Sequence, residues 1–211
     1  MNPFATRPIR AMLAVALAAA TLLGTTQAAQ AADPYTPSGG PEIDLVAEGE
    51  VVVTDLDAEA TSECTALPIA GALEDAGVPR PHSEHAGTLD DFSGDLCSHD
   101  YFGLTAIDFG GAWDLVVTGD PVGPVWPVEV RGVSASVAWV GCNYKLVGPG
   151  PGGTISGHFN TATQQFTSTG ADLQVQGVRG SCFIIGIADG NRVTIEGTWT
   201  NVAAAPLELS H

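Results

Sequence analysis

Histidine and aspartate side chains gather in one short segment of the chain, between residues 82 and 100. His82 and His85 are three residues apart, a spacing with which two imidazoles hold one divalent metal ion. A carboxylate and a further imidazole follow at Asp95 and His99. The metal-site hypothesis therefore names His82, His85, Asp95 and His99. Because Gly and Pro interrupt this segment, the alternative is an exposed polar loop that binds nothing.

Motifs for covalent catalysis or for cofactor binding are not found in the sequence. Residues 153–157 have Ser156 at the wrong position for a nucleophile elbow. Residues 147–153 are Gly-rich, but their prolines lack N–H donors and no Lys follows, so they do not form a phosphate loop. We therefore predict no catalytic residue and no cofactor. This favours a protein that is not an enzyme and leaves catalysis open as the alternative.

Four cysteines lie well after the N-terminus, at Cys64, Cys97, Cys142 and Cys182. An even number in an exported chain favours disulfides, and four cysteines allow three pairings. A faint repeat favours Cys64–Cys97 with Cys142–Cys182, because a Trp follows the second cysteine of each pair at 16 and 17 residues. This interpretation implies two related units that each close one disulfide. A four-cysteine zinc site is the disfavoured alternative, since no Cys-x-x-Cys pair is present.

The N-terminal residues have the pattern of a secretory signal peptide. Arg7 and Arg10 precede an apolar run from Met12 to Leu23 that is too short to span a bilayer, and small residues follow near Ala31. We predict cleavage after Ala31, no membrane span afterwards, and a secreted protein that is extracellular or associated with the cell wall. The seven Lys and Arg include Arg7 and Arg10, so cleavage leaves five against 24 acidic side chains, a net charge of −19. That charge repels nucleic acids, which excludes them as partners.

The rest of the chain carries strand signals. Apolar and polar residues alternate over 128–131 and 133–137, which is typical of strands with one buried face. A long β-rich run over 104–118 is broken at Gly110 and Gly111. Residues 183–187 and 192–196 flank an Asp-Gly turn and are expected to form a hairpin. The sequence therefore predicts a single all-β domain, an antiparallel sandwich or a small closed β-barrel with two disulfides.

The predicted boundaries are a signal peptide over residues 1–31, a flexible leader over 32–41, the all-β domain over 42–202 and a C-terminal tail over 203–211. Trp126 lies between Pro124 and Pro127 and is expected near the surface, where it is the candidate ligand contact. The other three tryptophans lie in strand-like runs and are expected in the core: Trp113, Trp139 and Trp199.

Several segments resemble a family of small exported proteins from actinobacteria. They are the alanine-rich export signal, the first Cys after a Val-rich strand, Gly141-Cys142, and residues 180–191. The resemblance covers roughly residues 50–202. It implies an exported, disulfide-linked β fold, and because the family is uncharacterised it implies no activity.

Together these features predict a non-catalytic exported domain that binds a surface, a glycan or a protein partner. Two alternatives stay open. One is an exported hydrolase with a dispersed carboxylate and His site, and the other is a divalent-cation-binding protein that uses residues 82–100. The sequence identifies neither the extracellular partner nor the oligomeric state.

Overall fold

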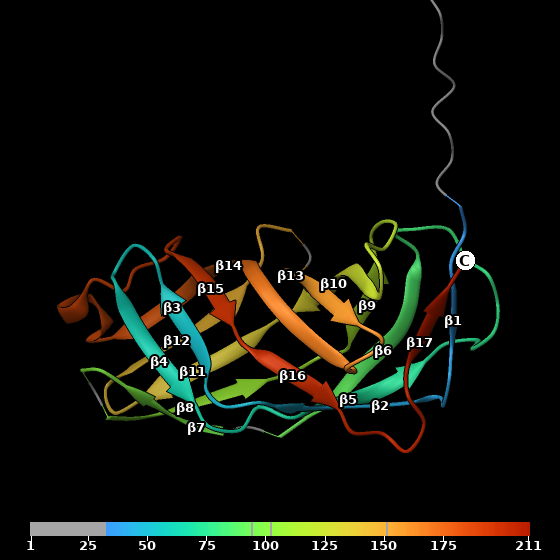
Figure 1. Ribbon diagram of the computed structural model, residues 1–211. Coiled ribbons are helices and arrows are strands. Elements are labelled where there is room, and N and C mark those ends of the chain that lie inside the picture. Colours follow the sequence, from blue (N-terminus) through green and yellow to red (C-terminus); the bar gives the residue numbers. More distant parts are fainter. Residues whose placement is uncertain (1–32, 94, 102, 151) are drawn as a thin grey trace, which may run out of the picture. The chain divides into compact units, whose positions relative to one another are not determined.

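The computed structural model describes residues 33–211, except residues 94, 102 and 151 (Figure 1). The predicted signal peptide, residues 1–31, lies outside the described residues. Nearly all regular structure is β, and η1 (Cys182–Ile185) is a short 3-10 helix. The prediction of an all-β fold is confirmed. Within the described part of the chain, no helix combines the length and the apolar character needed to cross a bilayer.

The strands form one closed antiparallel barrel of eight long strands. Each of them except β14 is interrupted near its midpoint and carries two labels. Neighbours in sequence pair around the ring, and the last long strand pairs back onto the first through β16–β2 and β15–β3. The fold is therefore a closed barrel and not a sandwich. The long strands are β2 (Glu42–Ala47) with β3 (Val51–Asp55), β4 (Ala60–Cys64) with β5 (Ile69–Leu73), β6 (His85–Phe92) with β7 (Asp95–His99), β8 (Gly103–Phe109) with β9 (Trp113–Val117), β10 (Val125–Val133) with β11 (Ala135–Trp139), β12 (Cys142–Val147) with β13 (Gly153–Asn160), β14 (Gln165–Gly180), and β15 (Arg192–Glu196) with β16 (Thr198–Asn201).

Glycines mark several of the interruptions. Gly111, between β8 and β9, has φ +92°, a conformation that side chains with a Cβ rarely adopt, so the predicted break at this point is confirmed. Gly152, between β12 and β13, packs against Gly132 of the neighbouring strand. A Cβ on Gly152 would lie 2.5 Å from the Gly132 Cα. Glycine therefore lets the two backbones touch at the middle of the barrel.

The interruptions divide the barrel into two halves that share β14. The strap half contains β2, β5, β6, β9, β10, β13 and β16, and the tip half contains β3, β4, β7, β8, β11, β12 and β15. Residues 165–172 of β14 pair with β13, and residues 174–180 pair with β12. At about 3.3 Å per residue, the 16 residues of β14 extend roughly 50 Å, which is long enough to serve both halves.

The barrel interior is packed with alternate residues of each strand. In β10 and β13 every second side chain is buried, as expected for strands with one face inside a barrel. Trp113 and Trp199 are 0% and 1% exposed, which confirms their predicted place in the core. Trp139 is half-buried and packs against that core.

The two ends of the described chain pair with each other outside the barrel. β1 (Thr36–Ser38) and β17 (Glu208–Ser210) form a two-stranded sheet, which we call the strap together with Leu207. Tyr35, next to β1, is fully buried, and Leu207 is 4% exposed. The leader that we predicted to be flexible instead pairs with the C-terminal tail, because its apolar neighbours Tyr35 and Leu207 are buried in the domain.

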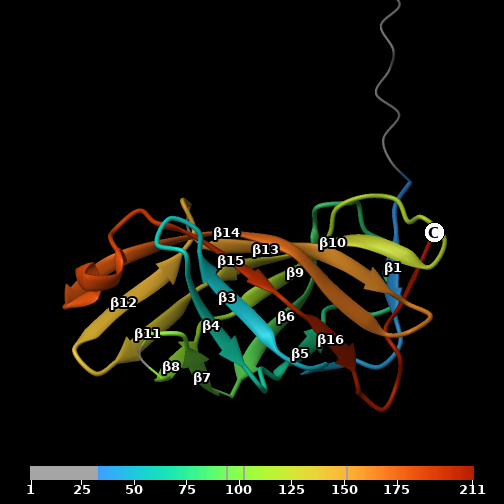
Figure 2. The same ribbon diagram turned by 60° about the vertical axis from the view of Figure 1, so that its left-hand side comes forward.

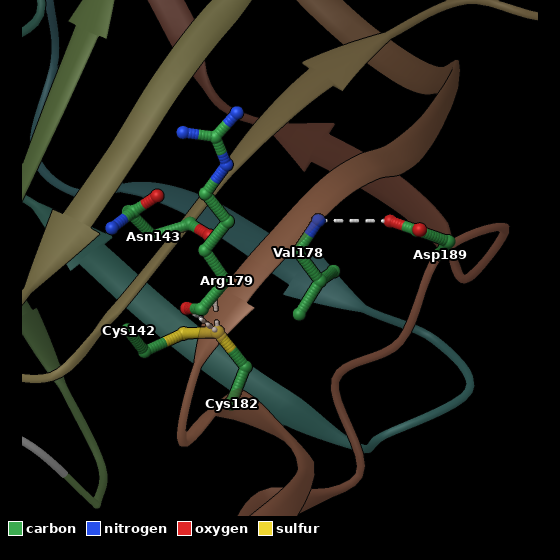
Figure 3. Close-up of a disulfide and its surroundings, with 6 residues drawn as sticks. All are labelled: Cys142, Asn143, Val178, Arg179, Cys182 and Asp189. Atoms are coloured by element: carbon green, nitrogen blue, oxygen red, sulfur yellow. Dashed lines mark hydrogen bonds between the residues drawn. A yellow bond between two sulfur atoms is a disulfide. The ribbon is translucent and has the colours of Figure 1, made fainter.

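The predicted disulfides Cys64–Cys97 and Cys142–Cys182 are both present. Cys64 and Cys97 lie on the paired strands β4 and β7, and Cys142 of β12 is joined to Cys182 of η1 (Figure 3). Both disulfides lie in the tip half. The predicted pairing is confirmed, and the interpretation that two related units each close one disulfide stays a prediction.

Candidate functional site

The four residues of the predicted metal site are spread along the barrel. His82 precedes β6 at the strap end, and His99 ends β7 at the other end. β6 and β7 are the two segments of one long strand, so His85 and His99 are roughly 45 Å apart along it. Asp95 lies in β7, where its backbone pairs with Ile107. Among the described residues no group of three or more His, Cys, Asp or Glu is arranged to hold a metal, so the predicted set is not assembled.

His99 has a structural role in the tip half. Its side chain is buried, and Nδ1 accepts a hydrogen bond from the Tyr101 backbone N–H at 3.1 Å. Its ring also lies 5.3 Å from the ring of Trp139, centroid to centroid. Burial lowers the pKa of His99, and the neighbouring Asp100 opposes this shift. A neutral imidazole that accepts at Nδ1 fits both observations.

Trp126 is a core residue, contrary to the prediction that it lies near the surface. It is 3% exposed and belongs to the inward-facing set of β10, together with Val128 and Val130. The flanking prolines do not interrupt this strand. Pro127 accepts a hydrogen bond from Thr118 through its carbonyl, and the N–H that it lacks is not required there. Trp126 is therefore not available as a contact for an external ligand.

Large apolar side chains are exposed together at the end of the tip half. This end carries the β3–β4, β7–β8 and β11–β12 turns and the connection from β14 through η1 to β15. In Figures 1 and 2, η1 projects from the same end of the barrel as these turns. Six of the ten exposed large hydrophobic residues in the described part of the chain lie here. We call them the apolar tip: Leu56, Tyr101, Leu104, Val140, Phe183 and Ile184.

The exposure of these side chains is high. Val140 is 100% exposed and Phe183 is 74% exposed, although both belong to residue types that are usually buried. Isolated surface hydrophobics are ordinary in soluble proteins, whereas a cluster of them marks an interaction site. Because every connection at this end contributes one or more, the tip is such a cluster.

Covalent and hydrogen-bonded contacts hold the connections of the tip together. The Cys142–Cys182 disulfide fastens η1 to β12, and the Ser181 backbone N–H donates to the Gly141 carbonyl at 2.7 Å. Farther along, the Val178 backbone N–H donates to the Asp189 carboxylate at 2.9 Å (Figure 3). η1 ends at Gly186, whose φ of +81° reverses the chain. Phe183 and Ile184 are therefore presented on a braced turn.

Acidic side chains surround the tip. Glu59, Asp100 and Asp189 are exposed on its connections. Asp57 is paired with Arg192, whose guanidinium Nη2 lies 2.7 Å from Oδ1, and these hydrogen bonds lower the pKa of Asp57. Arg179 is a further exposed base at this end. With one Arg neutralised by its partner, acidic groups outnumber basic ones around the apolar surface.

The apolar tip was not predicted from the sequence. Residues 183–187 were predicted to be a strand because they are β-branched and aromatic, but residues 182–185 form η1 instead. Cys182 is tied to β12 and Gly186 adopts the left-handed conformation, so the chain turns where a strand would continue. Gly186, inside the predicted strand, was the signal in the sequence that this segment turns.

Searches against protein-family models, against curated proteins and against solved structures find no match to this chain. The resemblance to exported actinobacterial proteins therefore stays a prediction, and the functional argument depends on the geometry alone.

Proposed function

We propose that the protein is an exported binding domain that holds a protein partner through the apolar tip. The observation that carries this proposal is the concentration of exposed large hydrophobic side chains on the connections at one end of the barrel. Aromatic side chains such as Phe and Tyr are enriched in interfaces, and a few buried residues, often Trp, Tyr or Arg, supply most of the binding energy. The two disulfides are consistent with an oxidising compartment outside the cytoplasm, which supports export.

The charge around the tip indicates the kind of partner. Glu59, Asp100 and Asp189 ring the apolar surface, and the domain as a whole is strongly acidic. Complementary charge favours a partner whose own apolar patch is bordered by Lys or Arg. An anionic lipid surface is repelled by the same charges. Nothing in the described geometry favours the hydrolase alternative over binding.

Site-specific photo-crosslinking tests the proposal in the secreted full-length protein. A photoreactive phenylalanine analogue is placed at Phe183 or Val140 in the tip, and at the exposed Val122, far from the tip, as the control. We expect both tip positions to give one common heterologous protein adduct in the culture of the source organism, and the control position to give none. Equal adducts from all three positions, or an adduct with a second copy of this chain, would contradict the proposal.

A matched pair of variants tests the energy of the contact. Phe183→Ser with Ile184→Ser removes two tip side chains, and Val46→Ser with Val122→Ser removes two exposed side chains elsewhere. All four side chains are solvent-exposed, so both double variants are expected to fold. Binding of the crosslinked partner should weaken about 100-fold or more in the tip variant and stay unchanged in the control. Raising the salt concentration should also weaken it, because the rim interaction is screened.

A further inference from the structure

The strap half encloses a cavity with an entirely apolar lining. Side chains from the barrel interior, such as Ile43, Val128 and Phe159, form most of its wall. Leu207 and Leu209 of the strap complete the wall at the end of the barrel. The free space is about 20 Å³, little more than one water molecule needs, and no polar group lines it. The cavity is therefore small and dry, and the strap leucines close it at the end of the barrel.

The strap is held over the barrel by the side chain of Gln164. Its Oε1 accepts from the Leu207 N–H at 2.8 Å, and its Nε2 donates to the Leu207 carbonyl at 3.0 Å. Asn201 donates to the same Oε1 at 3.1 Å. On the other strand of the strap, the Pro37 carbonyl accepts from the Gly77 N–H at 2.7 Å, and Tyr35 before it pairs with Arg80. These are a few isolated hydrogen bonds, whereas the barrel strands are joined by continuous ladders. The strap is thus the part of the cavity wall that can be displaced without breaking the barrel.

Two buried side chains beside the strap carry polar atoms without hydrogen-bond partners. Arg80 is 7% exposed, and its Nε has no partner. The side chain of His82 is 9% exposed, and both ring nitrogens lack partners. The Asp120 Oδ1 lies 3.8 Å from the His82 Nε2, too far for a hydrogen bond. Buried polar atoms usually have a hydrogen-bond partner, so these atoms have hydrogen-bonding capacity that a ligand group can use.

Arg80 lies beside segments that line the apolar cavity, and His82 is linked to Arg80 through Tyr35. The Arg80 guanidinium donates to the backbone carbonyls of His85 and Glu74. His85 directly precedes the cavity-lining residue Ala86, and Glu74 directly follows the cavity-lining residue Leu73. His82 stacks on Tyr35 with a centroid separation of 5.6 Å. Tyr35 in turn pairs through its backbone with Arg80, and it directly precedes β1 of the strap.

We propose that the strap half binds a long-chain carboxylate. Its alkyl chain lies in the barrel interior, in the space that Leu207 and Leu209 occupy when the strap is closed. Its carboxylate accepts hydrogen bonds from the Arg80 Nε and from His82, the two groups that have donors to spare. The Arg80 guanidinium has no carboxylate partner among the described residues, so its charge is free to pair with the ligand. This site is separate from the apolar tip, so a negative result for one proposal leaves the other unaffected.

Ligand chemistry on the unmodified protein is the first test. Decanoate, decanol and decylamine are titrated below their micelle concentrations by calorimetry, with butyrate as the short-chain control. We expect saturable binding of one decanoate, about tenfold or more tighter than decanol because hydrogen bonds to charged groups are the stronger ones. Decylamine and butyrate should not bind measurably. Equal affinity for decanoate and decylamine, or binding only above the micelle concentration, would overturn the proposal.

Three single variants separate the roles of the site residues. Arg80→Gln should weaken decanoate binding about tenfold or more while leaving decanol unchanged, and Lys145→Gln, an exposed cation on β12, is the charge-matched control. Gln164→Ala should strengthen decanoate binding about tenfold, because the strap is then released more easily. If Arg80→Gln fails to fold, the comparison of the four ligands and the affinity of Gln164→Ala still test whether the site binds a long-chain carboxylate. Unchanged affinity in Gln164→Ala would show that the strap does not compete with the ligand.

Discussion

The amide of Asn191 lies against the buried carboxylate of Asp55, with Nδ2 2.9 Å from Oδ2 and 3.1 Å from Oδ1. The contact joins the connection after η1 to the β3–β4 turn across a sequence separation of 136 residues. Asp55 Oδ1 also accepts from the backbone N–H groups of Asp57 and Ala58 at 3.0 and 2.8 Å. One carboxylate thus organises two of the connections that carry the apolar tip.

Replacing Asp55 with Ala should lower the free energy of unfolding by about 2–3 kcal/mol, because several donors at a buried site lose their acceptor. Guanidinium denaturation measures this loss. Asp108→Ala, at an exposed position of β8, is the control and should change stability by less than about 0.5 kcal/mol. A loss of that small size in Asp55→Ala would show that the carboxylate does not organise the tip.

Removing the disulfide at η1 should destabilise the protein and loosen the tip. In the chain-entropy model, the 40-residue loop closed by Cys142–Cys182 contributes about 3–4 kcal/mol, so the Cys142→Ala/Cys182→Ala double variant should lose about that much. Limited proteolysis should then cut within residues 181–191. Cys64→Ala/Cys97→Ala is the matched control, with a similar loss of stability but no new cleavage in this connection. Cleavage there in both double variants would argue against a specific role for the η1 disulfide.

Stability should fall on acidification because of His99. Burial lowers the pKa of His99 in the folded protein, so the unfolded chain binds a proton first as the pH drops. The contribution is complete above the unfolded pKa of about 6.5 and is lost as the pH falls from there through the folded pKa. His99→Gln should flatten the stability curve in this range, as measured by urea denaturation at successive pH values. A stability curve of His99→Gln that keeps the full slope of the unmodified protein in this range would contradict the prediction.

A glycine within a barrel strand and a glycine in a connection should differ sharply in their tolerance of Ala. A Cβ at Gly157 of β13 would lie 2.4 Å from the Thr167 carbonyl and 2.5 Å from the Phe166 ring, both on the neighbouring strand. Gly157→Ala is expected to cost about 1–3 kcal/mol through overpacking. Gly150 has open space around its Cβ, so Gly150→Ala should be close to neutral. Thermal unfolding of the two variants compares them directly, and equal melting temperatures would contradict the packing argument.

Local patterns in the sequence were sufficient to predict most of the strands and the all-β fold class, although residues 183–187 were wrongly predicted as a strand. Alternation over 128–131 places Val128 and Val130 in the barrel, and the break at Gly110 and Gly111 separates β8 from β9. The cysteine pairing was also predicted, from a faint repeat in the spacing of Cys and Trp. Cys64 and Cys97 are joined because β4 and β7 are neighbours in the ring. Ring neighbours are set by long-range pairing, which no local pattern reports.

The candidate sites were much less accessible to sequence reasoning. His82 and His99 are close in sequence, yet an extended strand separates them by most of the barrel length. Arg80 and His82 are recognisable as a pair only because the barrel buries them beside the strap. The apolar tip combines connections that are far apart in the sequence. Each of these sites combines residues that the barrel topology brings to one end of the molecule. The local sequence does not show which turns share an end.

The unbroken passage of β14 through both halves has a consequence for how the molecule can be divided. Each of the eight long strands contributes to the strap half and to the tip half, so the chain passes between the halves repeatedly. Neither half corresponds to a continuous stretch of the gene, and neither can be produced alone as a folded module. The two halves should therefore unfold in one cooperative step. A ligand bound at the carboxylate site should raise the melting temperature of the end that carries the apolar tip as well.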